Sequence, residues 1–221
     1  MSIVWTVTVK ELWQLIATRS MIVVGAFSGV FFSLVLSDGT ADGLKGMLSF
    51  VPMLVGLSLG YHGSSQVFLR EKTDFVIETL LCSPVSLRDL WLGKTFAVTL
   101  FGGAFAVAVG SLAVVLASVR ADVFVLPDCP VLLFLVLVVP LLVGCMVGAR
   151  GYVQLLLGAR ESHLASLGML MTVVLLLGAS GSGPALSSST VLTMGLIASA
   201  VVLALVWCSR FLSVERIVTS L

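Results

Sequence analysis

Five long runs of the sequence contain no Asp, Glu, Lys or Arg, and these runs limit what the chain can fold into. A helix needs about 20 mostly apolar residues to cross the hydrocarbon core of a membrane. The longest run, 162–209, is interrupted at 179–189 by a cluster of Gly, Pro and Ser that predicts a turn, so it holds two helices. The runs predict six spans, at about 20–37, 46–69, 95–119, 129–149, 162–179 and 189–209.

Composition favours the same interpretation. Hydrophobic residues make up 59% of the chain and charged residues 10%, whereas soluble domains carry about 25% charged residues. The runs are continuously apolar, while a strand of a membrane barrel would alternate between apolar and polar residues. We therefore expect an all-α integral membrane protein that forms a single transmembrane domain over residues 1–221.

The positions of the basic residues predict the orientation of these spans. Cytoplasmic segments of membrane proteins are enriched in Lys and Arg. With the N-terminus inside, the outer loops hold only Lys45 and Arg120. The inner segments hold the other ten, namely Lys10, Arg19, Arg70, Lys72, Arg88, Lys94, Arg150, Arg160, Arg210 and Arg216. We expect a multi-pass protein of the cytoplasmic (inner) membrane with both termini in the cytoplasm.

The segment 2–19, before the first span, has amphipathic helical spacing. Trp5, Val9, Leu12, Trp13 and Ile16 share one face, and Thr6, Lys10 and Gln14 share another. This pattern is typical of an elbow helix that lies in the membrane interface with its tryptophans at headgroup level. A straight cytoplasmic extension of the first span is the alternative interpretation.

The loop 70–94, between the second and third spans, is the longest polar segment. Its first half is helix-like, and Glu71, Asp74 and Glu78 fall on one helical face. Pro84 would end such a helix. The acidic face is either a contact surface for a soluble partner or an ordinary solvated surface.

This loop resembles the first cytoplasmic loop of the type-2 ATP-binding-cassette (ABC) permeases. That family has a pattern like E-R-E-x-G-T-x-E-x-L-L-x-S-P-x-S, followed by G-K. The residues in register are Glu71, Glu78, Leu80, Leu81, Ser83, Pro84, Ser86, Gly93 and Lys94. Phe75 and Val76 stand where the family has Gly-Thr, and Thr73 stands where it has an acid.

The resemblance implies a permease subunit, with export as the direction of transport. In the family, the loop forms a coupling helix that docks in a groove of a separate ATPase subunit. Carried onto this chain, the contact residues are Glu71, Asp74, Glu78, Leu80, Leu81, Ser83 and Pro84. The implied partners are that ATPase, a second copy or a similar permease chain, and membrane lipid.

Nucleotide chemistry is not expected in this chain itself. Gly93-Lys94-Thr95 looks like the end of a phosphate-binding loop, but that motif requires a glycine where Arg88 stands. The chain carries no catalytic motif either, so we expect no enzyme activity and no bound cofactor. ATP and Mg²⁺ would be held by the partner. The net charge of +1 argues against nucleic-acid binding.

Polar residues gather near the end of the second span, at Tyr61, His62, Ser65 and Gln66. Ionisable residues within a span are functional candidates, so these four could line a substrate path. His62 could instead be a neutral histidine hydrogen-bonded to a neighbouring helix, or a haem ligand. The four cysteines are scattered singly, so no metal site is expected.

Two other functions stay open. The haem-exporter B-type subunit of cytochrome c maturation is similar in length and span number, although its loop lacks the Ser-Pro-Val-Ser register. An ATPase-independent secondary transporter or channel would place charged residues inside its spans, and none interrupts the runs above. The Gly-x-x-x-Gly pairs Gly25/Gly29, Gly56/Gly60 and Gly144/Gly148 predict close helix packing, and could also serve a dimer.

Overall fold

In a computed structural model of the chain, the described residues are 3–36, 41–69, 86–121, 127–156 and 188–211. Every regular element within these ranges is helical, so the all-α prediction is confirmed for them. In chain order the elements are α1 (Ile3–Ala17), α2 (Arg19–Leu36), α3 (Ala41–Ser64), the π-helical turn η1 (Ser65–Leu69), α6 (Leu87–Ala121), α7 (Cys129–Leu133), the π-helical turn η2 (Phe134–Val138), α8 (Val139–Leu156), α10 (Ser188–Cys208) and the 3₁₀ turn η3 (Ser209–Phe211).

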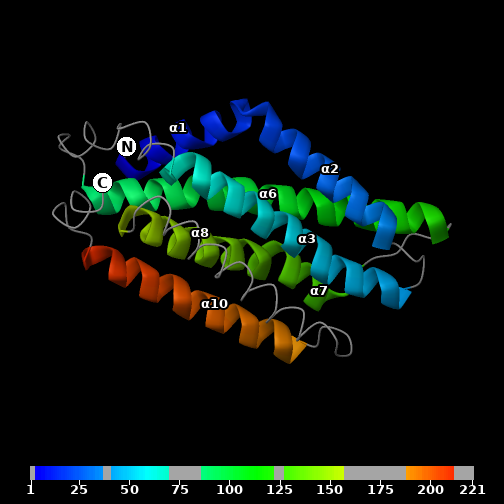
Figure 1. Cartoon of the computed structure of the whole chain (residues 1–221). Coiled ribbons are helices and arrows are strands. Elements are labelled where there is room, and N and C mark those ends of the chain that lie inside the picture. Colours follow the sequence, from blue (N-terminus) through cyan, green and yellow to red (C-terminus); the bar gives the residue numbers. More distant parts are fainter. Residues whose placement is uncertain (1–2, 37–40, 70–85, 122–126, 157–187, 212–221) are drawn as a thin grey trace.

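The long helices lie side by side in one bundle, and α1 runs across its edge (Figure 1). The axes of α1 and the following segment of α2 differ by 71°. Helix α1, the end of α3, the start of α6 and the ends of α8 and α10 lie at the same end of the bundle, which we call the terminal end (Figure 1). Because of the bend, α1 does not continue α2 as a straight extension.

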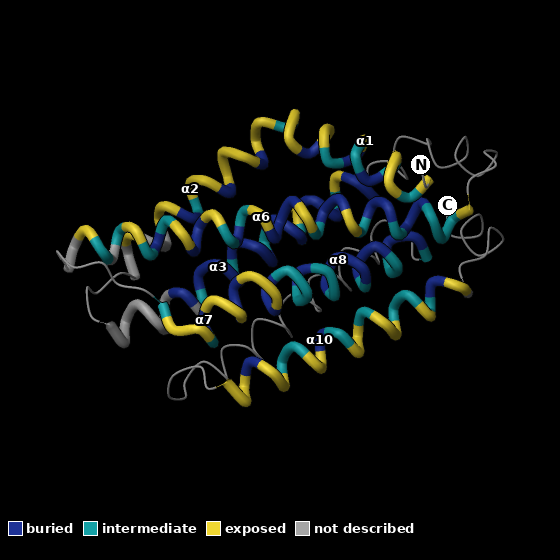
Figure 2. The backbone as a smooth tube through the Cα atoms, turned by 180° about the vertical axis from the view of Figure 1, so that it is seen from behind, coloured by how far each residue is buried: buried dark blue, intermediate teal, exposed yellow. Residues whose placement is uncertain are grey.

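The core lies between α3, α6 and α8. These three helices carry most of the buried positions, whereas α2 and α10 are exposed along much of their length (Figure 2). Val51 and Val55 of α3, Val98 of α6 and Val143 and Val147 of α8 are almost completely buried. The three inner helices therefore form the framework on which any site at the terminal end is built.

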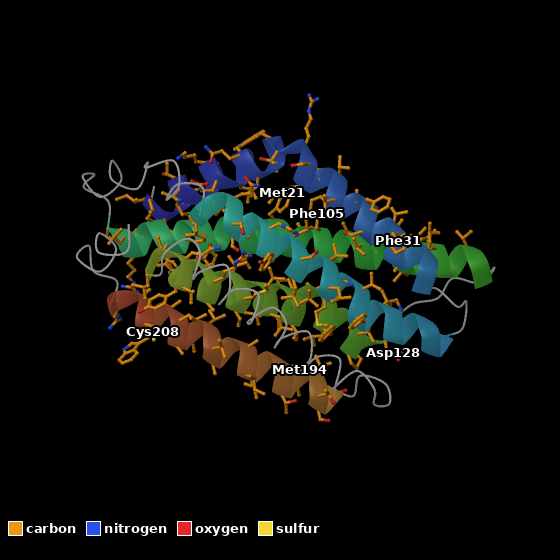
Figure 3. All side chains as sticks on the ribbon, in the orientation of Figure 1. Met21, Phe31, Phe105, Asp128, Met194 and Cys208 are labelled. Carbon is orange, nitrogen blue, oxygen red and sulfur yellow. The ribbon has the colours of Figure 1, made fainter. Side chains whose placement is uncertain are left out.

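Glycines allow the inner helices to approach closely. A Cβ atom added at Gly102 of α6 would lie 3.1 Å from the carbonyl oxygen of Gly56 in α3. One turn further along α6, Phe105 meets α2: a Cβ added at Gly25 would lie 3.0 Å from its ring, which Figure 3 labels beside α2. The predicted close packing at these pairs is confirmed, and it occurs within the chain.

The outer surface carries large apolar side chains. Phe27 of α2 and Leu196 and Leu203 of α10 are each about 70% exposed, and α1 exposes Trp5 and Trp13. Within the described residues, three helices are long and apolar enough to cross a membrane, namely Leu87–Leu116, Cys129–Leu156 and Ser188–Cys208. Counting the bent pair α1 and α2 as one span makes four. Long apolar helices of this kind are compatible with a protein embedded in a membrane.

The start of α6 differs from the expected span 95–119, because the helix already begins at Leu87. Its start is fixed by Ser86 as the N-cap residue. The Asp89 amide donates a hydrogen bond to Ser86 Oγ (3.1 Å), and the Ser86 hydroxyl donates one to Asp89 Oδ2 (2.7 Å). The last part of the expected loop 70–94 is therefore the first two turns of α6.

The fourth expected span, 129–149, corresponds to α7, η2 and α8, which continue to Leu156. The turn η2 precedes Pro140, which has no amide hydrogen to offer the carbonyl four residues earlier. A wider helical turn at this point accommodates the missing bond. The first, second and sixth expected spans correspond to α2, to α3 with η1, and to α10. The fifth, 162–179, lies outside the described residues.

Candidate functional site

The four polar residues proposed from the sequence as a substrate path lie together on one side of α3 and η1. Tyr61 and Ser65 are half-buried, and His62 and Gln66 are exposed. We call Tyr61, His62, Ser65 and Gln66 the polar patch. It lies towards the terminal end of the bundle, where α3 leads into η1 (Figure 1).

His62 stands edge-on to the neighbouring Tyr61 ring, with ring centroids 5.5 Å apart and planes at 88°. One interpretation of the sequence expected His62 to be hydrogen-bonded to a neighbouring helix. Among the described residues, His62 forms no such hydrogen bond. An exposed imidazole and amide on an apolar helix cost free energy in contact with lipid alone. The patch is therefore suited to face a polar group, from a ligand, from water or from another chain.

Behind the polar patch lies Arg150 of α8, which is 1% exposed. Its Nη1 donates a hydrogen bond to the Tyr61 carbonyl oxygen, and its Nη2 donates one to Ser65 Oγ (2.7 Å). The guanidinium carbon lies 3.4 Å from the centroid of the Tyr61 ring. Arg150 thus binds two residues of the polar patch from the interior side.

Two further buried side chains bind carbonyl groups at this end of α3. With its amide oriented to match its neighbours, Gln154 donates to the Ser64 carbonyl (3.3 Å) and accepts from Arg150 Nε (3.1 Å). Lys94 of α6, 1% exposed, donates from Nζ to the Val67 carbonyl (3.0 Å). We call Lys94, Arg150 and Gln154 the carbonyl clamp. Cations at this position also oppose the partial negative charge at a helix C-terminus.

The sequence places Lys94 and Arg150 just outside two spans, in polar segments on the cytoplasmic side. Both are buried inside helices that are long and apolar enough to span a membrane. Burial is possible because each cation donates to a backbone carbonyl. Within the described ranges, no carboxylate forms an ion pair with Arg150. Charged residues therefore occur within these two apolar helices, within about two turns of their ends at the terminal end of the bundle.

Helix α1 is attached to the same region through Gly93, the neighbour of Lys94. A Cβ atom at Gly93 would lie 2.8 Å from Val7 Cβ and 3.0 Å from the Val4 carbonyl oxygen. The hydroxyl of Thr8, which is buried, has one hydrogen to donate and two acceptors within reach, the Gly93 carbonyl (3.1 Å) and the Val4 carbonyl (2.8 Å). A side chain at position 93 would push α1 away, so glycine is required for this contact.

Three polar side chains of α6 lie in a row on the face that packs against α8. Trp91 Nε1, Thr95 Oγ1 and Thr99 Oγ1 are buried and have no hydrogen-bond partner among the described residues. The three side chains are spaced by four residues, so they lie on one face, opposite Gly144 and Gly148. Each unpaired polar atom costs about 1–3 kcal/mol.

The expected ATPase-contact residues cannot be placed in this geometry. Glu71, Asp74, Glu78, Leu80, Leu81, Ser83 and Pro84 all lie outside the described residues. Both segments that flank them are described, η1 before and Ser86 after. Among the described residues, no group of three His, Cys, Asp or Glu is placed to hold a metal ion.

The carbonyl clamp was not foreseen from the sequence. Lys94 and Arg150 end two charge-free runs, so the sequence pattern places them just outside the spans. The sequence does contain a signal for an irregular helix end, because Gly63-Ser64-Ser65 lies within an apolar run, and Gly/Ser pairs are frequent sites of helix distortion.

Comparison of the chain with protein-family models, with curated proteins and with solved structures found no match.

Proposed function

We propose that the chain is the permease subunit of an ABC transporter, in which a separate ATPase subunit binds ATP and Mg²⁺. The observation that carries this proposal is the run from Glu71 to Lys94, in which nine residues match the coupling loop of type-2 permeases. The chain would work as a homodimer, or paired with a similar chain, and export its substrate.

The contacts at the two ends of this loop support a mechanical role. Lys94 in the second turn of α6 binds the Val67 carbonyl in η1, so the segment before the loop and the segment after it are joined by a hydrogen bond. Ser86 and Asp89 fix the first turn of α6. A force applied to the loop would therefore reach the inner helices α3 and α6 together.

The arrangement of the helices supports six spans with both ends on one side. Helix α8 ends and α10 begins at opposite ends of the bundle, while α1 and the end of α10 share the terminal end (Figure 1). The expected span 162–179 would complete an up-and-down order. We assign the terminal end to the cytoplasm, because Lys10, Arg88 and Arg210 belong to it.

Helix α1 fits the proposed elbow. Trp5, Trp13 and Ile16 are exposed on one side, and Thr8, Glu11 and Leu15 are buried against the bundle. The 71° bend directs α1 across the bundle instead of along it. Tryptophans on such a helix suit the headgroup region of a membrane.

The substrate path would include the polar patch, with lipid-like or amphiphilic molecules as the substrate class. The surfaces beside the patch are apolar, and the patch offers an imidazole, an amide and hydroxyl groups. An amphiphile could bind its polar end there and keep its apolar part in contact with the helices.

Co-purification tests the proposal. The chain, expressed with the ATPase encoded beside its gene, should form a complex and transport in liposomes only when ATP is present. Charge reversal by Glu71→Arg with Glu78→Arg should abolish both the complex and transport. The matched control is Lys10→Glu, because Lys10 is exposed on α1. Unaltered transport after the double reversal would contradict the proposal.

An ATPase-independent secondary transporter is the second candidate, and the burial of Arg150 favours it. Buried ionisable residues inside membrane spans often belong to ion or substrate pathways. The same liposomes, without any ATPase, distinguish the two functions. Transport driven by an imposed ion gradient, and lost in Arg150→Met, would establish the second candidate and exclude the first.

A further inference from the structure

The burial pattern at the end of α3 repeats every four residues. The buried pairs Leu59–Gly60, Gly63–Ser64 and Val67–Phe68 alternate with the accessible pairs Tyr61–His62 and Ser65–Gln66. In an α-helix with 3.6 residues per turn, a repeat of four residues drifts by about 40° at each step. The π-helical turn η1 compensates for this drift, so Gln66 stays in line with His62 on the polar patch.

The cause of the wider turn is a competition for one carbonyl oxygen. The Tyr61 carbonyl accepts from Ser64 Oγ (2.9 Å), from Ser65 Oγ (3.4 Å) and from Arg150 Nη1. Side chains that insert into the i→i−4 hydrogen-bond ladder distort a helix at that point. Of these three donors, only Arg150 comes from another helix, so only Arg150 makes the distortion depend on the position of α8.

We propose that Arg150 is the positioning residue of the polar patch: it holds η1 in its π-helical register and thereby keeps Gln66 beside His62. Gln154 assists by binding the adjacent Ser64 carbonyl and Arg150 Nε. Without Arg150, the segment can return to the α-helical register. With 3.6 residues per turn, Gln66 would then be displaced by about 40° from His62 around the axis of α3.

Spin labels at two positions test the register. Cys82, Cys129, Cys145 and Cys208 are replaced by serine, which keeps a donor for the bond from Cys145 to the Ala198 carbonyl. A nitroxide is then attached through His62→Cys or Gln66→Cys. Position 62 precedes the register change and serves as the internal control. Both labels should be mobile when Arg150 is present, because both positions are exposed.

In Arg150→Met, we expect the mobile component of the label at position 66 to decrease while that of the label at 62 stays unchanged. Arg150→Lys should give two populations at position 66, since a lysine has no planar fork to bind both partners. Arg19→Met, which removes an arginine from an exposed position, should change neither label. Unchanged spectra at 66, or equal changes at 62 and 66, would overturn the proposal.

If Arg150→Met does not fold, a second variant that destabilises the protein less can be used to test the proposal. Gln154→Leu leaves Arg150 in place and should produce a partial loss of mobility at position 66 alone. A fully mobile label at 66 in folded Gln154→Leu, combined with an unfolded Arg150→Met, would assign a purely structural role to Arg150.

The consequence for transport rests on the proposed function. There, Arg150→Met should reduce transport and still form the complex with the ATPase, because the loop residues are unchanged. If no complex forms even with the unaltered chain, the proposed function fails, and the spin-label result stands by itself. If the label at 66 shifts and transport is unaffected, Arg150 sets the register without positioning a substrate path.

Discussion

The guanidinium carbon of Arg150 lies 3.4 Å from the centroid of the Tyr61 ring, and the same side chain donates a hydrogen bond to the Tyr61 carbonyl. One residue of α8 thus binds both the side chain and the backbone of one residue of α3. The contact joins two inner helices at the point where α3 changes from an α-helix to a π-helical turn.

The ring contact predicts different effects for two substitutions of Tyr61. Tyr61→Leu removes the cation–π interaction, which is worth about 2 kcal/mol when it is shielded from water. Tyr61→Phe keeps the ring face and should stay close to the unaltered protein. Thermal unfolding in detergent micelles, followed by circular dichroism, measures both. Equal losses in Leu and Phe variants would mean that the hydroxyl, and not the ring, provides the stability.

The position of Lys94 predicts a large cost for its removal. Lys94→Met leaves the buried Val67 carbonyl without this donor, at a cost of about 1–3 kcal/mol in the free energy of unfolding. Lys10→Met is the matched control, because the Lys10 side chain is 62% exposed, and no comparable loss is expected. Denaturant unfolding in micelles measures the difference. An equal effect of both substitutions would contradict the assignment of Lys94 to the clamp.

The contact between α1 and α6 predicts that Gly93→Ala destabilises the protein. The added Cβ would lie 2.8 Å from Val7 Cβ, and overpacking of this kind costs about 1–3 kcal/mol. Gly195→Ala is the control, since the nearest atom to its Cβ lies at 3.6 Å, an ordinary contact. That control should be neutral or gain up to about 1 kcal/mol from helix propensity. Thermal unfolding distinguishes the two alanines.

The unpaired hydroxyls of Thr95 and Thr99 predict that valine at both positions raises stability. Valine has a similar shape and no polar atom, so each substitution should gain about 1 kcal/mol. Thr8→Val is the control with the opposite sign, because the Thr8 hydroxyl has two carbonyl acceptors. Unfolding temperatures of the two variants are compared. Destabilisation by the Thr95→Val, Thr99→Val pair would show that water or another group binds these hydroxyls.

Much of the helical layout could be predicted from the sequence because hydrophobicity is a local property. A run without charged residues identifies an apolar helix whatever surrounds it, and α2, α3 and α10 correspond to such runs. The Gly-x-x-x-Gly pairs likewise predict close packing, although their partners, such as Gly102 and Phe105, could not be named in advance.

The ends of the helices are harder to predict from the sequence, because a charged residue at the end of an apolar run looks like the end of a span. Lys94 and Arg150 are instead buried, because carbonyl groups of another helix satisfy their donors. Those carbonyls belong to Val67 and Tyr61, where α3 passes into η1, and Arg150 reaches the Tyr61 carbonyl from a helix far along the chain.

The apolar, helical character of the chain and the gathering of polar residues at Tyr61, His62, Ser65 and Gln66 follow from composition and spacing, which act through each helix alone. The binding of the end of α3 by Lys94, Arg150 and Gln154 follows from the packing of three helices. A buried cation is stable only where its hydrogen-bond acceptors converge, and convergence of separate helices depends on packing.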